Sequence, residues 1–150
     1  MLHSLIRKST IVAYLRLQLI YIVCAFCLFA GWQVTVRGLH IRASGGGQIA
    51  DVAAGANFSG PDLSGQTVAP SWGLYLRNLH ESSISGLSLS FTENDDRIAI
   101  ILDHCEGVSF GDNLSLARGS KAAYDVGLRA SARVQLPAQI KTCVYPQCIF

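Results

Sequence analysis

The sequence predicts an all-β fold of about three to four coils of parallel strands, preceded by one apolar N-terminal helix. Residues 1–32 are almost wholly apolar, whereas short alternating runs separated by Gly, Ser, Asn and Asp follow from Val34 onward. These runs resemble one another at intervals typical of solenoids, and no helix-length amphipathic stretch separates them. An antiparallel sandwich is the structural alternative that the periodicity leaves open.

Length and charge limit the classes of function. The chain of 150 residues is long enough for one modest domain. Twelve Lys and Arg stand against ten Asp and Glu, and none of them forms a basic block of the kind that neutralises a phosphate backbone. We therefore expect no nucleic-acid partner.

Residues 1–32 are expected to form a signal peptide or a single transmembrane helix. The apolar run follows Arg7 and Lys8, and a helix from Ile11 to Trp32 would just span a hydrocarbon core of about 30 Å. Basic residues before the run would send the remainder outward. A buried helix of a soluble protein is the third alternative. The first two interpretations make the β-rich part membrane-anchored and facing outward, or secreted or periplasmic.

Residues 33–136 are expected to form the coils. The run from Val34 to Ile41 resembles the run from Ser82 to Leu89. Leu39 and Leu87 are 48 positions apart, which we interpret as about two coils of roughly 24 residues. Leu87 and Leu114 are 27 apart, which is about one coil.

A second series of runs interleaves with the first. Gly73–Arg77 and Arg97–Leu102 lie about 26 positions apart, so each coil has at least two strands. Stacked like on like, the apolar residues of both series would form a continuous core. The predicted inward residues are Val34, Val36, Leu39, Ile41, Leu74, Leu76, Leu79, Ile84, Leu87, Leu89, Phe91, Ile98, Ile100, Leu102, Val108, Phe110, Leu114 and Leu116.

Two segments do not fit the repeat. Residues 43–71 contain Gly45-Gly-Gly47 and other chain breakers, so they are expected to form a long loop between coils. Residues 137–150 are expected to be an irregular tail. Cys143 and Cys148 lie in it and would close a small loop in an oxidising compartment.

The ordered set of these runs is similar to the closing coils of a known protein family. Roughly positions 33 to 117 carry the resemblance: Val34–Ile41 leading to Gly45-Gly-Gly47, then Gly73–His80, Ile84–Phe91, Asp95-Asp-Arg97 and Ile98–Val108. They resemble the last coils of bacterial family 28 glycoside hydrolases, the polygalacturonase-like proteins. The resemblance implies a right-handed parallel β-helix of the pectin-lyase type.

The chemistry of that family does not transfer with the fold. Its members are similar in hydrolysing pectic chains with inversion, using Asn-x-Asp, Asp-Asp, Gly-His-Gly and Arg-x-Lys elements on successive earlier coils. This sequence has no Asn-x-Asp followed one coil later by Asp-Asp, no Gly-His-Gly and no Arg-x-Lys. We therefore expect a truncated member, related to pectin degradation but lacking the catalytic coils. The alternative is a membrane-anchored module that binds pectic polysaccharide without cleaving it.

Three aspartates are the candidates for acid–base chemistry, namely Asp95, Asp96 and Asp103. Inverting hydrolysis needs two carboxyl groups held about 6.5 to 9.5 Å apart. Asp95 and Asp96 are neighbours, whose side chains point to opposite faces of an extended chain, which suits a solvated turn. Asp103 precedes His104 at a strand end, and no third ligand with metal spacing is visible. We expect no catalytic residue, no metal site and no cofactor.

Two aromatic residues are the candidates for carbohydrate stacking. Trp72 and Tyr75 flank Gly73, and an exposed aromatic face could stack on a sugar ring. Packing of the long loop against the coil is the structural alternative for the same residues.

Overall fold

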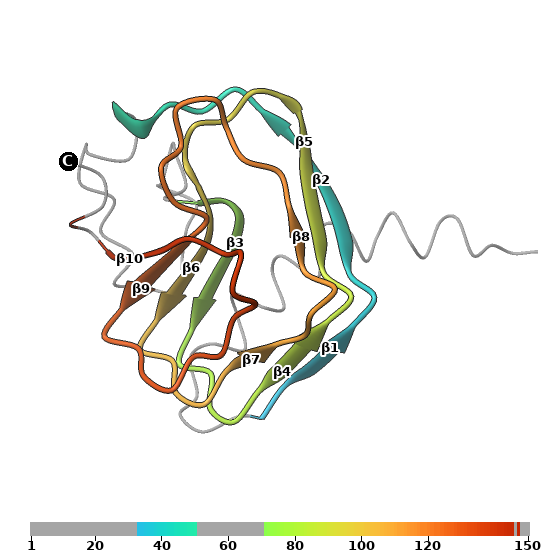
Figure 1. The fold of residues 1–150 in the computed structure, drawn as a ribbon, viewed down its shortest axis with the longest axis vertical. Coiled ribbons are helices and arrows are strands. Elements are labelled where there is room, and N and C mark those ends of the chain that lie inside the picture. Colours follow the sequence, from blue (N-terminus) through green and yellow to red (C-terminus); the bar gives the residue numbers. More distant parts are fainter. Residues whose placement is uncertain (1–32, 51–70, 146, 148–150) are drawn as a thin grey trace, which may run out of the picture.

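The structure, a computed structural model, describes residues 33–50, 71–145 and 147. The strands of this part form three parallel sheets (Figure 1). The first sheet contains β1 (Thr35–Arg37), β4 (Ser83–Ser85) and β7 (Ser109–Phe110). The second contains β2 (His40–Gly45), β5 (Ser88–Glu93) and β8 (Ser115–Leu116). The third contains β3 (Ser71–Arg77), β6 (Ile98–Asp103), β9 (Val126–Arg129) and β10 (Thr142–Val144).

The chain visits the first, second and third sheets in turn and then begins the same circuit again (Figure 1). Strands of successive circuits pair in parallel register, such as Ser83 with Ser109 and Leu74 with Ile100. All seven strand pairings are parallel, so the antiparallel sandwich is wrong for this part of the chain. The all-β, parallel class that the sequence predicts is confirmed.

The first interval of the repeat differs from the prediction. Thr35 pairs with Ser83 and His40 with Ser88, so the 48-residue spacing joins adjacent circuits. The interpretation of this spacing as two coils was wrong, because the segment between β2 and β3 lengthens the first circuit. Residues 51–70 of the predicted loop lie outside the described residues.

The turns after β3, β6 and β9 have the same conformation in successive circuits. Asn78, His104 and Ala130 stand 26 positions apart, and each has a positive φ, of 56°, 52° and 46°. The fourth residue of the same turn also has a positive φ, which is 43° at Glu81 and 51° at Arg133. A left-handed residue breaks an extended strand, so this turn directs the chain from the third sheet into the first. His104 is therefore a turn residue.

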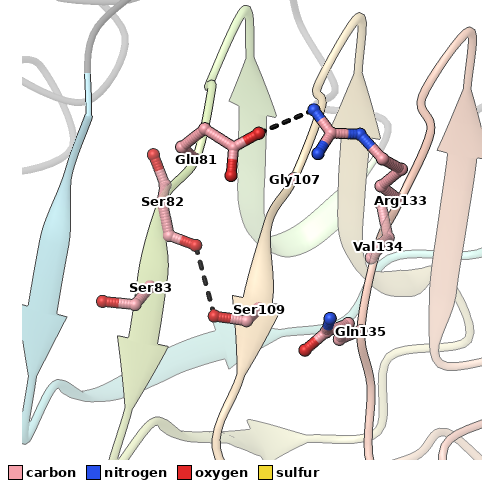
Figure 2. Close-up of a pocket in the computed structure, with 8 residues that line it drawn as sticks. All are labelled: Glu81, Ser82, Ser83, Gly107, Ser109, Arg133, Val134 and Gln135. Atoms are coloured by element: carbon pink, nitrogen blue, oxygen red, sulfur yellow. Dashed lines mark hydrogen bonds and ion pairs between the residues drawn. The ribbon is translucent and has the colours of Figure 1, made fainter.

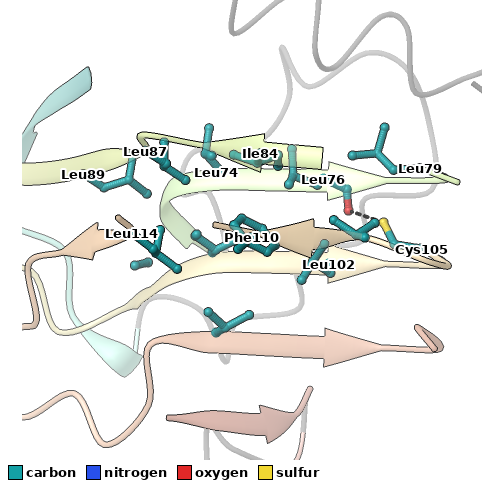
Figure 3. Close-up of a cluster of buried hydrophobic side chains, with 14 of the residues drawn as sticks. Leu74, Leu76, Leu79, Ile84, Leu87, Leu89, Leu102, Cys105, Phe110 and Leu114 are labelled. Carbon is teal, nitrogen blue, oxygen red and sulfur yellow. Dashed lines mark hydrogen bonds between the residues drawn. The ribbon is translucent and has the colours of Figure 1, made fainter. Parts of the chain in front are cut away.

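The interior is filled by apolar side chains that stack in register (Figure 3). Leu87 and Leu89 are 1% exposed, and Ile100 and Leu102 are fully buried. Of the predicted inward residues, only Ile98 lies neither in the core cluster nor packed against it; it is buried beside Gly127. The sequence interpretation missed other members of the cluster or residues packed against it, namely Trp72, Ala43, Ala99, Cys105, Ala117, Val126, Leu128, Val134, Leu136 and Ile140.

The first circuit is less covered than those that follow. Val36 and Ile41 are partly buried, whereas Ile84 and Leu89, their partners in the next circuit, are 4% and 1% exposed. A core residue is covered from both sides only when a circuit lies above and below it. The N-terminal end of the described coil therefore leaves part of its interior accessible.

The tail continues the third sheet, contrary to the prediction of an irregular segment. β10 pairs with β9 through Thr142–Val126 and Val144–Leu128. The residues between β9 and β10 are too few for a full circuit, so the chain returns to the third sheet by a shorter path. Cys143 is disulfide-bonded, while Cys105 is a buried thiol; Cys24, Cys27 and Cys148 lie outside the described residues.

The helix predicted for residues 1–32 also lies outside the described residues. Within the described part, no helix has the length and apolar character needed to cross a membrane.

Candidate functional site

Asp95 is a fully buried carboxylate that joins two circuits. It accepts hydrogen bonds from Nε and Nη2 of Arg97, at 2.9 and 2.7 Å, and from the backbone N–H of Arg97 at 3.1 Å. The N–H of Gly47, 48 positions away, donates a fourth at 3.1 Å. A Cβ at Gly47 would overlap Nε of Arg97, so the missing side chain makes room for the guanidinium.

Burial acts to raise the pKa of Asp95, but the hydrogen bonds from Arg97 and Gly47 outweigh it and hold the pKa below its usual value. The carboxylate is thus charged, and both of its oxygens accept hydrogen bonds from Arg97 or Gly47. The expectation of a solvated turn was wrong, because this side chain has no exposed surface. Its position suits a structural ion pair and not proton transfer to a substrate.

Asp96 is also a hydrogen-bond acceptor, and it joins its circuit to the following one. Its Oδ1 accepts hydrogen bonds from the N–H of Lys121 at 3.0 Å and from the side-chain amide of Asn94 at 2.8 Å. The bond from Lys121, followed by the bond from Asn94, lowers the pKa of Asp96. This side chain is 8% exposed, so it is buried and not solvated as expected.

Asp103 lies at the centre of what we call the outer-face cluster, made up of Tyr75, Arg77, Asp103 and Arg129 on the third sheet and His104 in the turn after β6. Arg77, Asp103 and Arg129 occupy the same register position on β3, β6 and β9. Asp103 is 1% exposed, and its Oδ2 lies 3.6 Å from Nε of Arg77 and 3.8 Å from Nη1 of Arg129. His104 Nδ1 lies 2.6 Å from its Oδ1.

Tyr75 completes this cluster by donating a hydrogen bond from its hydroxyl to Oδ2 of Asp103 at 2.5 Å. Burial and this bond raise the pKa of Tyr75. The cluster contains one carboxylate, whereas inverting hydrolysis needs two. Within the described ranges there is also no group of three or more His, Cys, Asp or Glu residues that could hold a metal ion.

The second polar feature is a pocket of about 510 Å³ at the turn between the third and first sheets, which we call the corner pocket (Figure 2). Residues of three successive circuits line it: Glu81, Ser82, Ser83, Gly107, Ser109, Arg133, Val134 and Gln135. Nη2 of Arg133 lies 2.6 Å from Oε1 of Glu81 and 3.0 Å from Oε1 of Glu106. A Cβ at Gly107 would lie 2.5 Å from Oε1 of Glu81, so glycine keeps the space between the charged residues open.

The two aromatic candidates differ in their exposure. Trp72 is 7% exposed, and its ring meets that of Phe91 edge to face, with centroids 5.1 Å apart. The proposal that Trp72 stacks on a sugar was wrong, because both faces of a core residue are covered. Tyr75 is partly buried and its hydroxyl is bonded to Asp103, so its main contact is within the outer-face cluster.

The structure brings together Tyr75 and Asp103, but it places Asp95 and Asp96 in separate buried networks. Sequence reasoning missed the corner pocket, although a signal was present. Ser83, Ser109 and Gln135 follow one another at intervals of 26 and share a register position. No protein-family model matches the chain, and no curated protein or solved structure matches it either.

Proposed function

We propose that this chain is a piece of a right-handed parallel β-helix of the pectin-lyase type, related to family 28 glycoside hydrolases and to pectin degradation, and that it lacks the catalytic coils. The repeated circuit through three parallel sheets supports the β-helix. The partly covered interior of the first circuit supports the loss of coils that would precede it.

The main support for a relationship to family 28 is the position, within the fold, of the residues that resemble that family. Gly73-Leu-Tyr-Leu76 lies within β3, and β6 ends in Leu102-Asp103. Asp95-Asp-Arg97 lies between β5 and β6, where the family resemblance expects charged residues after a strand. The order and the structural context of these pieces therefore agree with the closing coils of such a protein.

The contacts of Asp95, Asp96 and Asp103 support the proposal that this chain has no hydrolase activity. Asp95 is bound by a guanidinium and by two backbone N–H groups, and Asp96 is bound by backbone and amide donors. Asp103 has no second carboxylate in its cluster. A general acid and a general base cannot be assigned to this set.

Incubation of the purified full chain with polygalacturonate tests this proposal. We expect no release of reducing ends above the buffer control. The proposal would be contradicted if the wild-type chain hydrolysed polygalacturonate and the Asp103→Asn variant did not, while both gave the same circular dichroism spectrum. Asp103 is itself buried and ion-paired, so the unchanged spectrum is needed to separate lost chemistry from a lost fold.

The second candidate function is polysaccharide binding without cleavage by a module that residues 1–32 anchor in a membrane or direct to export. The corner pocket favours it, because hydroxyl, amide, guanidinium and carboxylate groups converge there. Protease added to intact cells tests the outward orientation. Digestion of the β-rich part is expected, and complete protection in cells that are shown to contain the protein would contradict it.

A further inference from the structure

The first circuit presents two strands at the edges of their sheets, which we call the β1–β2 edge. β1 lies at one end of the first sheet and β2 at one end of the second, so each pairs on one side only within the part that the structure describes (Figure 1). An edge strand presents a row of backbone N–H and C=O groups that can pair with another chain. The backbone at this end of the coil is therefore suited to the addition of a strand.

An added strand would also cover apolar side chains. Val36, Ile41 and Ala43 are partly buried and pack against the core from one side. They alternate with exposed residues along β1 and β2. Side chains of a strand point alternately to its two faces, so every second residue of an added strand would lie over this row. The β1–β2 edge thus favours a partner with an apolar residue at every second position.

The exposed residues that alternate with this row include three basic ones. Arg37, His40 and Arg42 are exposed, and residues 33–50 contain no Asp or Glu. Each of the three pairs in register with a serine of β4 or β5, so the next circuit supplies no opposite charge. None of them forms an ion pair with another residue of the described ranges. Opposite charges on neighbouring strands stabilise a sheet, so the edge favours carboxylates on its partner.

These charges distinguish between the possible occupants of the edge. Residues 1–32 contain three Lys or Arg and no acidic residue, and no acidic residues recur at every second position in residues 51–70. A second copy related by a two-fold axis would bring Arg42 toward its own copy, and like charges on paired strands are destabilising. A copy stacked head to tail would bring β8 to β2, and β8 has no acidic residue. A different, acidic protein fits the edge better than this chain does.

We propose that the β1–β2 edge binds an extended segment of another protein in which acidic residues alternate with apolar ones. The segment adds a strand to the second sheet beside β2, and main-chain hydrogen bonds hold it there. Its apolar residues cover Ile41 and Ala43, and its carboxylates lie beside His40 and Arg42. Arg37 extends the positive charge along β1, which speeds the approach of an acidic partner. This inference does not depend on the relationship to family 28.

A peptide of alternating Glu and Val, blocked at both ends and as long as the six residues of β2, is the probe. Its binding to the detergent-solubilised full chain is measured by fluorescence anisotropy. Joint replacement of Arg37 and Arg42 by Ser, the residue at the same register position in the next circuit, should weaken binding by about twofold to thirtyfold. Joint replacement of Lys121 and Lys141 by Ser removes the same charge from exposed positions on later circuits and should leave the affinity unchanged.

Two peptide controls separate strand pairing from attraction between charges. A peptide with Lys in place of Glu should bind more weakly than the acidic probe. The acidic probe with N-methyl groups at every second residue keeps its charge but loses donors along one edge, so it should bind about tenfold more weakly or worse. Equal binding of the methylated peptide overturns strand pairing, and equal binding of the Lys peptide or of the Arg37 and Arg42 variant overturns the charge assignment.

Two outcomes of the wild-type measurement overturn the proposal as a whole. The first is the absence of binding of the acidic probe. The second is a stable dimer in sedimentation analysis that the probe does not dissociate, because a second copy would then occupy the edge. Neither outcome bears on the proposed loss of catalytic coils, which the polygalacturonate assay tests separately.

Discussion

Replacement of Asp95 by Asn tests the conclusion that this carboxylate holds the coil together. The side chain is fully buried, and its two oxygens accept four hydrogen bonds, three from Arg97 and one from Gly47. In the Asp95→Asn variant one oxygen becomes an NH₂ group, which would face two donors at whichever oxygen it replaces. The variant also removes the negative charge opposite the guanidinium of Arg97, whose side chain is only 13% exposed.

The expected magnitude follows from that geometry. Removal of one partner from a buried ion pair destabilises a protein by about 3–5 kcal/mol, because the other charge remains buried without compensation. Asn keeps one oxygen as an acceptor, so we expect a loss near the lower end, about 3 kcal/mol. Such a loss is a large part of the stability of a small domain, which is about 5–15 kcal/mol.

Urea unfolding of the full chain at pH 7, followed by circular dichroism, measures the loss. Glu81→Gln is the matched control, since it removes one carboxylate from an ion pair whose side chains are 52% and 61% exposed. Exposed pairs contribute at most about 1 kcal/mol. A loss below about 1 kcal/mol in Asp95→Asn, or one equal to that of the control, would refute the structural role of this carboxylate.

Three further predictions concern the loss of stability at acidic pH, the close backbone contact at Gly45 and the burial of the Cys105 thiol. The pKa values of Asp95 and Asp96 are lowered by folding, so their contribution to stability is complete above pH about 4 and is lost as the pH falls through the lower folded values. Thermal melts from pH 7 to pH 3 should show this loss, and a melting temperature that rises on acidification would contradict it. Gly45→Ala should destabilise the chain by about 1–3 kcal/mol more than Gly38→Ala, as measured by urea unfolding. Both glycines have positive φ, but of the two only Gly45 lies where a Cβ would overlap a neighbouring backbone, at the carbonyl oxygen of Glu93; equal losses would show that this contact relaxes. Cys105 is 1% exposed, so iodoacetamide should modify it in urea and leave it unmodified in buffer, as judged by peptide mass spectrometry. Rapid modification of Cys105 in buffer would mean that the core around it opens.

Much of the core was predictable because stacked strands repeat their environment. Leu87 and Leu114 are 27 positions apart, and both are buried in the same cluster. Inward and outward positions alternate along a strand, so short apolar runs indicate the buried face. Cys105 was missed because it follows a turn residue and belongs to no alternating run. Val126 alternates with Leu128 in β9, 26 positions after Ile100 and Leu102, but the predicted repeat did not extend to this strand.

The candidate site was less predictable. The acidic residues could be identified, but their partners are distant in sequence: Gly47 donates to Asp95 across 48 positions, and Arg133 reaches Glu81 across 52. A carboxylate in a sequence can be exposed and reactive or buried and paired. Only the positions of the surrounding donors distinguish these states.

From sequence alone, the all-β class and the inward face of most strands could be derived, because alternation and repeat length are local properties of the chain. The tertiary structure decided that 48 residues separate the first two circuits, since a spacing does not distinguish two short coils from one coil with an insertion. It also decided that Asp95 and Asp96 are bound by neighbouring donors, and that Glu81 and Arg133 meet at one pocket. These features depend on which circuits lie side by side, and stacking brings together residues that are far apart along the chain.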